Sequence, residues 1–178
     1  MGIFTQELLD NGITPKQIYD KSNQYLDSLY GKTYAGGLIF YLNTTDGTGL
    51  VATPSDLGQA QWGCAGTEIG GTNRDVGTGQ ANTTTIVTAC TAPGIAAKIC
   101  DDLVLNGFSD WFLPSKDELL AMYRNLKAKD FGSFQNRNYW SSSETYSINA
   151  CSVHFDDGHA YSNANKLNSY FVRAVRAF

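Results

Sequence analysis

An Asp157-Gly158 dipeptide sits in the middle of a segment whose residues alternate between apolar and polar side chains. This dipeptide is a strong signal for a two-residue type I′ hairpin turn. Such a turn pairs His154 with Tyr161 and Phe155 with Ala160, and strand alternation then sorts the flanking residues into two faces. The sequence therefore predicts a hairpin with one apolar face, carrying Val153, Phe155 and Ala160, and one polar face that a ligand could contact, carrying His154, Asp156, His159 and Tyr161.

The composition around this turn is unusual. Between Thr145 and Phe171 the chain has no Glu, Gln, Met or Trp, and its only Lys is Lys166. Ser, Asn, Asp and Tyr predominate instead, and these residues combine rigid contact area with adaptable hydrogen bonding, as antibody loops do. We interpret the segment 138–178 as a displayed recognition surface held in place by the rest of the chain.

Length and composition suit one mixed domain with a short appendage. The chain has 178 residues, of which only 17 % are charged, and 18 glycines, which favours many short strands joined by turns. The net charge of -4 without a basic run argues against a nucleic-acid partner. No apolar stretch approaches the roughly 20 residues needed to span a bilayer, so membrane insertion is not expected.

Residues 1–31 are predicted to form a helical appendage outside the main domain, residues 32–178. Thr5 is expected to cap a helix over 6–10, and Thr14-Pro15 to begin a second helix that continues to about Tyr30. Two hypotheses follow for its apolar side. It packs against its own domain, or it docks or oligomerises the protein, as a trimer or on a virion.

The central part of the chain is expected to alternate between strands, loops and helices. Strands are predicted over 36–42 and 49–53 around an Asp46-Gly47 turn, followed by a long ordered loop region over 55–92. A helix is predicted over 93–105. Ser115 and Glu118 form a capping box for a helix that ends near Leu126, which accounts for the carboxylates there without catalysis. Residues 171–178 alternate as one closing strand.

The four cysteines do not match a zinc-binding spacing. A Cys64–Cys90 disulfide and buried free thiols are both compatible with the sequence. Cys151, His154, Asp156, Asp157 and His159 could be taken for a metal site, but alternation places Cys151 opposite His154 and no supporting hydrogen-bond pattern is visible. We predict neither a metal nor a cofactor.

Several motifs resemble known families. The variable region of diversity-generating retroelement target proteins, which have a C-type lectin-like fold, is similar to this chain at Tyr139–Glu144, Ala150, Val153, Phe155, Gly158, Lys166 and the closing VRAVRAF. The C-terminal domain of bacterial collagen-like adhesins is similar at 36–40, 60–64, 77–82 and 110–115. The resemblance covers about residues 34–178. It implies an α+β C-type lectin-like fold with short antiparallel strands, two helices and long ordered loops.

The resemblance also implies a mechanism for the composition. Adenine-directed mutagenesis of Asn codons cannot produce Glu, Gln, Met, Trp or Lys, nearly the set missing from 145–171. Cys151 falls among the implied variable positions, but alternation puts it on the core side. The ligand-binding residues implied by the resemblance are Thr145, Tyr146, Ser147, Ile148, Asn149, Ser152, His154, Asp156, Asp157, His159, Tyr161, Ser162, Asn163, Asn165, Leu167, Ser169 and Tyr170.

Together these features predict a hypervariable receptor-binding protein that is not an enzyme. Its expected partner is a protein or glycan on a bacterial surface, and its expected location is a phage tail or head fibre, because the N-terminus does not read as a secretion signal. The alternatives are a bacterial cell-surface adhesin of the same fold and a formylglycine-generating-type enzyme using Cys100 and Cys151. The calcium-binding motifs of sugar-binding C-type lectins are absent from the sequence.

Overall fold

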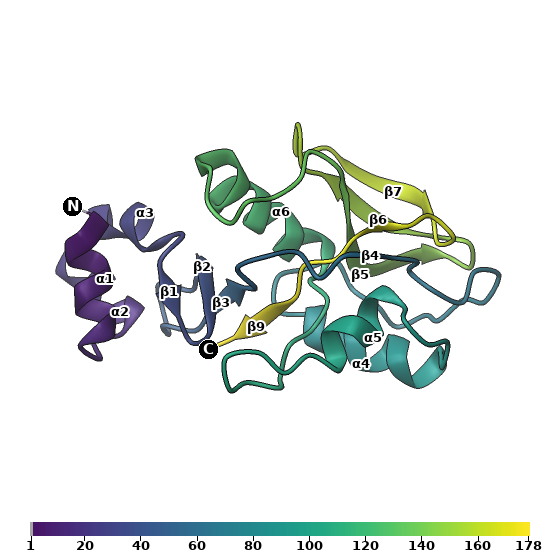
Figure 1. The fold of residues 1–178 in the computed structure, drawn as a ribbon, viewed down its shortest axis with the longest axis horizontal. Helices are drawn as coiled ribbons and strands as arrows, with labels where there is room; N and C mark the ends of the chain where they lie inside the picture. Colours follow the sequence, from purple (N-terminus) through teal and green to yellow (C-terminus); the bar gives the residue numbers. More distant parts are fainter. Residues whose placement is uncertain (1) are drawn as a thin grey trace.

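Two β-sheets follow one another along the molecule in the computed structural model, which describes residues 2–178 (Figure 1). The first sheet has the order β1 (Thr33–Tyr34), β2 (Gly37–Leu42), β3 (Gly49–Ala52), β9 (Val175–Ala177). The second, here called the binding sheet, has the order β4 (Gln59–Ala60), β8 (Tyr170–Phe171), β5 (Asn138–Tyr146), β6 (Asn149–His154), β7 (Ala160–Asn165). The strand pairs are antiparallel except β5 with β8. The predicted α+β class is confirmed.

The N-terminal segment is more broken than predicted. It consists of α1 (Gly2–Asp10), α2 (Pro15–Lys21), a 3-10 turn at Asn23–Tyr25 and α3 (Leu26–Leu29). The Thr14 cap is confirmed, with a reciprocal capping box to Gln17. A continuous helix to Tyr30 was wrong, because Ser22 adopts an extended conformation and its hydroxyl caps the next turn at Gln24. Thr5 does not begin a helix; it lies buried inside α1.

These helices cover the end of the first sheet rather than standing apart (Figure 1). Leu9, Ile18 and Leu29 are buried in the same apolar cluster as Ile39 of β2. The Gln6 side chain makes two hydrogen bonds of 3.0 Å to the backbone of Thr33. The chain thus occupies the main apolar side of these helices itself, which accounts for that side without a partner. A docking role for their outer surface stays a prediction.

One helix was missed and another was overestimated. The predicted loop 55–92 contains α4 (Gly79–Ala89), whose sequence GQANTTTIVTA is rich in β-branched residues of low helix propensity. Tertiary packing overrides that propensity. Ile86 is fully buried, and the Thr83 hydroxyl both donates to the Leu113 carbonyl and accepts from the Leu113 amide. The helix predicted over 93–105 is only α5 (Ala96–Asp101).

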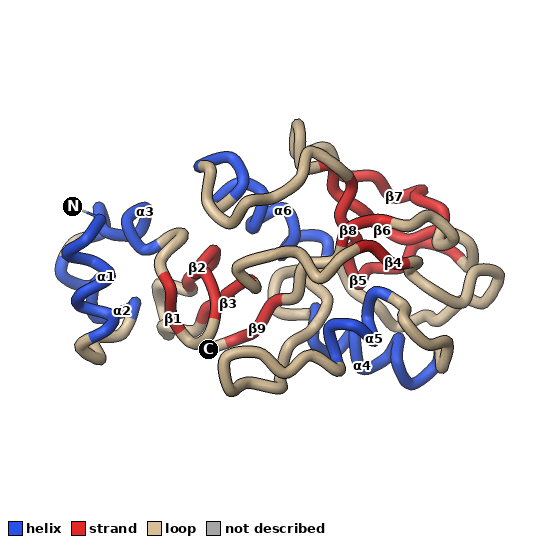
Figure 2. Tube along the Cα trace, in the orientation of Figure 1, coloured by secondary structure: helices blue, strands red, loops and turns tan. Residues whose placement is uncertain are grey.

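The helix α6 (Lys116–Asn125) begins at the predicted Ser115–Glu118 capping box and is followed by a 3-10 turn at Lys127–Lys129. Its buried side, including Leu119 and Met122, joins Tyr139 and Phe155 of the binding sheet and its hairpin in one apolar cluster. Figure 2 shows α6 to the left of this sheet and α4 and α5 below it. None of the helices in residues 2–178 is long and apolar enough to cross a bilayer.

The closing segment 171–178 is not one strand, as predicted, but two short strands in different sheets. Tyr170–Phe171 pairs with β4 and β5, and Val175–Ala177 pairs with β3. Arg173 lies between them, 1 % exposed, so the chain turns from one sheet to the other around a buried cation. The alternation seen in the sequence is real, but it is interrupted where the segment crosses.

Candidate functional site

The hairpin β6–β7 forms the outer edge of the binding sheet, and its register differs from the prediction by two residues. His154 bonds to His159, Val153 pairs with Ala160 and Ser152 pairs with Tyr161. The loop is therefore Phe155–Gly158, with Gly158 in the left-handed conformation at φ 74°. Because the shift is an even number, His154, His159 and Tyr161 still share a face, as predicted.

Beyond the Ser152–Tyr161 pair, the regular alternation of side chains along β7 is interrupted. Ala150 pairs with Ala164 and Ser152 with Tyr161, so β7 carries one more residue than β6 between the two pairs. Such a bulge places Tyr161 and Ala164 on the same side of the sheet although they are three residues apart. A two-residue period read from the sequence cannot locate it.

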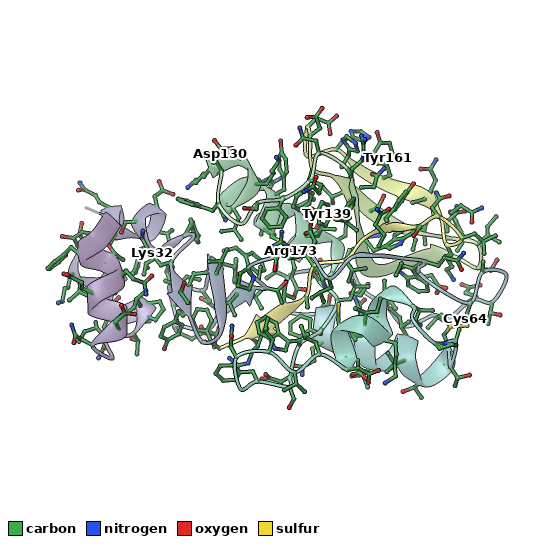
Figure 3. All side chains as sticks on the ribbon, in the orientation of Figure 1. Lys32, Cys64, Asp130, Tyr139, Tyr161 and Arg173 are labelled. Carbon is green, nitrogen blue, oxygen red and sulfur yellow. A yellow bond between two sulfur atoms is a disulfide. The ribbon has the colours of Figure 1, made fainter. Side chains whose placement is uncertain are left out.

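Most of the predicted ligand-binding residues reach the surface. Tyr146, Ile148, Tyr161 and Leu167 are 66, 51, 40 and 60 % exposed. Thr145, Ser147, Asn149, His154 and Tyr170 are partly buried. The remaining exposed positions of the set are Asp156, Asp157, His159, Ser162, Asn163, Asn165 and Ser169. Figure 3 shows Tyr161 on the outer strand, away from the helices that cover the sheet.

Ser152 is the exception, because it does not reach the surface; its predicted ligand-binding role stays a prediction. It is completely buried on the central strand β6, between Trp140 on β5 and Tyr161 on β7. Large neighbours on both sides of a small residue close over it. Cys151 is also fully buried, as alternation indicated, with its sulfur 3.5 Å from the Thr145 hydroxyl.

The side of the hairpin that faces α6 is built from stacked aromatic rings. The Tyr139 and Phe155 ring centroids are 4.3 Å apart, and Phe134 packs within 5.0 Å of Phe155. Val153 completes the surface, and all four side chains are buried. Aromatic pairs of this kind add to the free energy gained by burial. The apolar face predicted for Val153 and Phe155 is therefore the foundation of the site.

A buried ion pair supports the opposite end of the sheet. Lys166 donates to the Glu144 carboxylate and to the Thr67 carbonyl (3.0 Å), and its ammonium lies 4.5 Å from the centre of the Trp62 ring. Glu144 also accepts from the amides of Ile69 (2.9 Å) and Gly70 (2.7 Å). The pair thus joins β5, the end of β7 and the loop 64–72. Sequence analysis marked both residues only by resemblance, because nothing local indicates a contact between them.

A disulfide anchors this loop. Cys64 and Cys90 are bonded, with 5.9 Å between their Cα atoms, which resolves the alternative that the sequence left open. The bond ties the loop to the end of α4. A backbone bond of 2.9 Å from Gly66 to Ser147 then connects the loop to the β5–β6 turn. The disulfide therefore stabilises the exposed β5–β6 turn indirectly, through the loop and its bond to Ser147.

A second buried network lies at the junction of the two sheets. Arg173 donates to Asp56 (2.8 Å) and to the carbonyls of Thr53 (2.7 Å) and Gly132 (2.8 Å). The Tyr139 hydroxyl donates to the same carboxylate at 2.9 Å, and Figure 3 shows Tyr139 and Arg173 close together. Burial lowers the pKa of Arg173 and raises the pKa of Tyr139. These groups fix the start of β5.

The loop of the hairpin holds the predicted titratable residues. The Asp157 carboxylate accepts from the His159 amide at 2.9 Å, and this bond lowers the pKa of Asp157. The His154 ring nitrogen Nδ1 lies 3.7 Å from the same carboxylate, and the His159 and Tyr161 rings meet edge to face at 4.5 Å. Within the described part of the chain, no three His, Cys, Asp or Glu side chains are grouped as metal ligands would be.

A shallow groove runs along the outer face beside the hairpin. It has a volume of about 250 Å³ and is lined by Asn138, Tyr161, Asn163, Ala164, Asn165, Asn168 and Tyr170. A neighbouring hollow of about 280 Å³ shares Asn138 and Tyr170 with it. Asn138 and Asn168 were not among the predicted contacts. Their chain positions flank the predicted residues, so the only signal was their place in the fold.

Comparison with known proteins gives a solved structure of similar fold and a protein family. The fold is similar to that of a fimbrial protein from Bacteroides ovatus, at 17 % sequence identity and a TM-score of 0.52. The match covers 71 % of this chain and 35 % of that one, so the chain spans about a third of the fimbrial protein. No curated protein sequence matches the chain. The model of the Lcl C-terminal domain matches residues 59–176, a range that contains the whole binding sheet, and the chain therefore belongs to the Lcl C-terminal domain family.

Proposed function

We propose that this protein is an adhesin-type ligand-binding protein whose C-terminal face recognises a receptor on a bacterial surface. The distribution of exposed large apolar side chains carries the proposal. Among the side chains that the structure describes, four of these lie within 145–170, namely Tyr146, Ile148, Tyr161 and Leu167. The others are spread over the chain: Phe4, Val76, Val104 and Phe131. A local concentration of exposed apolar groups among polar residues is typical of an interaction surface.

Three of these residues form what we call the tip cluster: Tyr146, Ile148 and Leu167. A backbone bond of 3.0 Å from Lys166 to the Ile148 carbonyl brings the last two to the same end of the sheet, and Tyr146 lies beside Asn149 in the register of β5 and β6. Tyr146 is two residues from Glu144 and Leu167 is next to Lys166, so the tip cluster adjoins the Glu144–Lys166 pair along the chain. A rigid base beneath exposed aromatic and aliphatic groups lowers the conformational cost of binding.

A setting on the bacterial surface is favoured over a virion by one observation: the protein of similar fold is named as a fimbrial protein. The Cys64–Cys90 disulfide fits both settings, because such bonds persist on cell surfaces and on virion surfaces. The virion setting keeps its place as the alternative, to be separated by locating the protein on cells or on particles with an antibody.

We propose in addition that the face is diversified by a retroelement and that the fold is C-type lectin-like. The burial pattern supports this. Of the positions expected to be constant, Ala150, Val153, Phe155 and Lys166 are fully buried and Gly158 is partly buried, whereas most positions expected to vary are exposed. Substitutions at such exposed positions leave the core intact. Sequencing the DNA beside the gene tests the idea: a near-copy of the 138–178 segment that differs mainly at adenines is expected, and its absence contradicts diversification.

A non-enzymatic role is part of the proposal. The two free cysteines of the enzyme alternative, Cys100 and Cys151, are both fully buried, and burial raises the pKa of the Cys100 thiol, which disfavours the reactive thiolate. Replacing Cys100 with Ser is expected to leave ligand binding unchanged.

Cell binding tests the main proposal. The fluorescently labelled protein is added to a panel of bacterial strains and bound fluorescence is measured by flow cytometry. Replacing Tyr146, Ile148 and Leu167 together with Ser should abolish binding to any strain that the parent protein labels. The matched control replaces Val104, which is 72 % exposed but lies outside this face, with Ser and should bind normally. Equal binding by both variants would overturn the proposal.

A further inference from the structure

We propose that the groove beside the hairpin is a subsite for one uncharged sugar ring, with Asn138 and Ser152 as binding residues. This inference rests on the proposed function and names the ligand chemistry of one part of the face. The groove is lined by amide and phenol side chains: Asn138, Asn163, Asn165, Asn168, Tyr161 and Tyr170. None of its lining residues carries a formal charge.

Two buried polar atoms on this face have no hydrogen-bond partner within the described chain. They are the Asn138 Oδ1 and the Ser152 Oγ. Asn138 pairs with His154, and Ser152 pairs with Trp140 on one side and with Tyr161 on the other. Directly opposed residues share a face of the sheet, so both atoms belong to the face that holds the groove. Buried polar atoms are nearly always paired, so two neighbouring exceptions beneath one groove point to a ligand.

The groove also offers aromatic walls for the apolar face of a ring. The Tyr170 ring lies 4.5 Å from the buried Trp140 ring, which fixes one wall, and Tyr161 is held edge to face by His159. The phenol of Tyr170 is oriented by a 2.9 Å bond from the Asn168 side chain, and the Asn165 side-chain oxygen Oδ1 accepts from the Leu167 amide at 2.9 Å. The polar groups are thus set before a ligand arrives, which is the usual design of a small-molecule site.

These features select one ligand class. A sugar hydroxyl is both a donor and an acceptor. It can donate to the Asn138 side-chain oxygen, and it can either donate to or accept from the Ser152 hydroxyl. The C–H face of the same ring packs against Tyr. A sulfated or carboxylated sugar would bring charge to a groove without a cation among its lining residues. An extended peptide would run along the exposed edge of β7 and leave both buried atoms unpaired.

Both atoms are buried, so the proposal requires small movements of side chains when the ligand binds. Asn138 is partly exposed and lines both hollows, and rotation of its amide exchanges the oxygen with the nitrogen. Ser152 is completely buried and pairs with Tyr161, whose side chain is 40 % exposed, so the proposal requires rotation of the Tyr161 ring to expose the Ser152 hydroxyl. The subsite therefore has a signature in which binding shifts Tyr161 as well as the amides.

The probes are the methyl glycosides of mannose, galactose, glucose and N-acetylglucosamine, each titrated into the whole ¹⁵N-labelled protein and followed by NMR. Concentrations up to about 50 mM are needed because a single-ring site binds in the millimolar range. At least one glycoside should shift the side-chain amide signals of Asn138, Asn165 and Asn168. The inference is overturned if only methyl glucuronide or only a peptide shifts these signals. It is also overturned if none of the probes shifts them.

Two variants and one matched control locate the effect. Asn138→Leu and Ser152→Ala should each weaken the titration, by about tenfold for a hydrogen bond lost from a buried site. Neither should lower the melting temperature, since each removes an unpaired buried atom. The control is Ser141→Ala: Ser141 is as buried as Ser152, but its hydroxyl donates to the Cys151 carbonyl at 2.8 Å. That variant should melt earlier and bind the glycoside normally.

An unchanged titration in both variants would identify the two atoms as merely water-bridged and overturn the subsite. The cell-binding assay separates this from failure of the proposed function. If the tip-cluster variant loses cell binding while Asn138→Leu and the glycosides have no effect, the adhesin proposal stands and the groove falls. If the glycoside binds but the tip-cluster variant labels cells normally, the groove stands as a sugar subsite and the adhesin proposal based on the tip cluster falls.

Discussion

The two faces of the binding sheet hold their side chains by different means. Beneath the sheet, Tyr139, Val153 and Phe155 are closed against α6 mainly by apolar packing, and the Tyr139 hydroxyl is bonded to Asp56. On the outer face, the buried residues Trp140, Ser152 and Lys166 are separated by exposed ones. The difference indicates that the outer face tolerates substitutions only at the exposed positions between these buried residues. A surface that is to change its ligand without losing its fold needs this division.

The largest expected effect on stability comes from breaking the buried Glu144–Lys166 ion pair. Lys166→Ala leaves the Glu144 carboxylate buried without its partner, so we expect a loss of about 3–5 kcal/mol in the free energy of unfolding. Urea denaturation measures it. The double variant Glu144→Leu with Lys166→Met removes both charges and should recover most of the loss. If Lys166→Ala unfolds at the parent's urea concentration, the pair is not a support of the tip.

The disulfide is the next largest. Replacing Cys64 and Cys90 with Ser should lower the free energy of unfolding by about 3 kcal/mol, as expected for a bond that closes a loop of 26 residues in sequence separation. The comparison sharpens if hydrogen exchange at the Gly66 amide, which donates to the Ser147 carbonyl, rises while exchange under α6 does not. A uniform rise across the domain would mean that the bond stabilises the whole fold rather than the tip.

The exposed residues should matter least to stability and most to binding. Replacing His154, Asp156, His159 and Tyr161 together with Ala should cost no more than about 0.5 kcal/mol for each site, because none is fully buried. The same protein should lose ligand binding. Phe155→Ala, one residue from His154 but fully buried, is the matched contrast and should cost about 3–5 kcal/mol. Similar melting temperatures for the two variants would erase the distinction between the faces.

The smallest effect concerns pH at the hairpin loop. The His159 amide lowers the pKa of Asp157 below its ordinary value of 3.8, so the ionised carboxylate favours the folded loop. This contribution is complete above the unfolded pKa and is lost as pH falls through the folded one. The His159 amide signal should therefore move only at acidic pH, below the ordinary Asp value. Asp157→Asn should not titrate there, and an identical titration in that variant would assign the movement to another group.

Sequence patterns predicted the local parts of this fold well. Thr14 and Ser115 begin helices because their caps depend on residues only three positions away. The faces of Val153, Phe155 and Tyr161 followed from alternation alone. The class, α+β, followed from the mixture of these signals.

Long-range contacts could not be predicted from the same patterns. The Glu144–Lys166 pair depends on the loop at Ile69 and Gly70, which is more than 70 residues before Glu144. The burial of Ser152 depends on Trp140 and Tyr161 in neighbouring strands. The helix α4 depends on packing that overrides a Thr-rich sequence. In each case the deciding atoms are distant in the chain, and no local propensity reports them.

The split of the closing segment between two sheets also governs when the protein can become active during synthesis. Val51 pairs with Arg176, and Gln59 pairs with Phe171, so each sheet joins an early strand to a very late one. Contacts of such sequence separation form late and slowly. A nascent chain that stops before residue 170 has neither sheet complete and can display no finished binding face. A copy truncated before residue 170 is therefore expected to lack the proposed ligand-binding face.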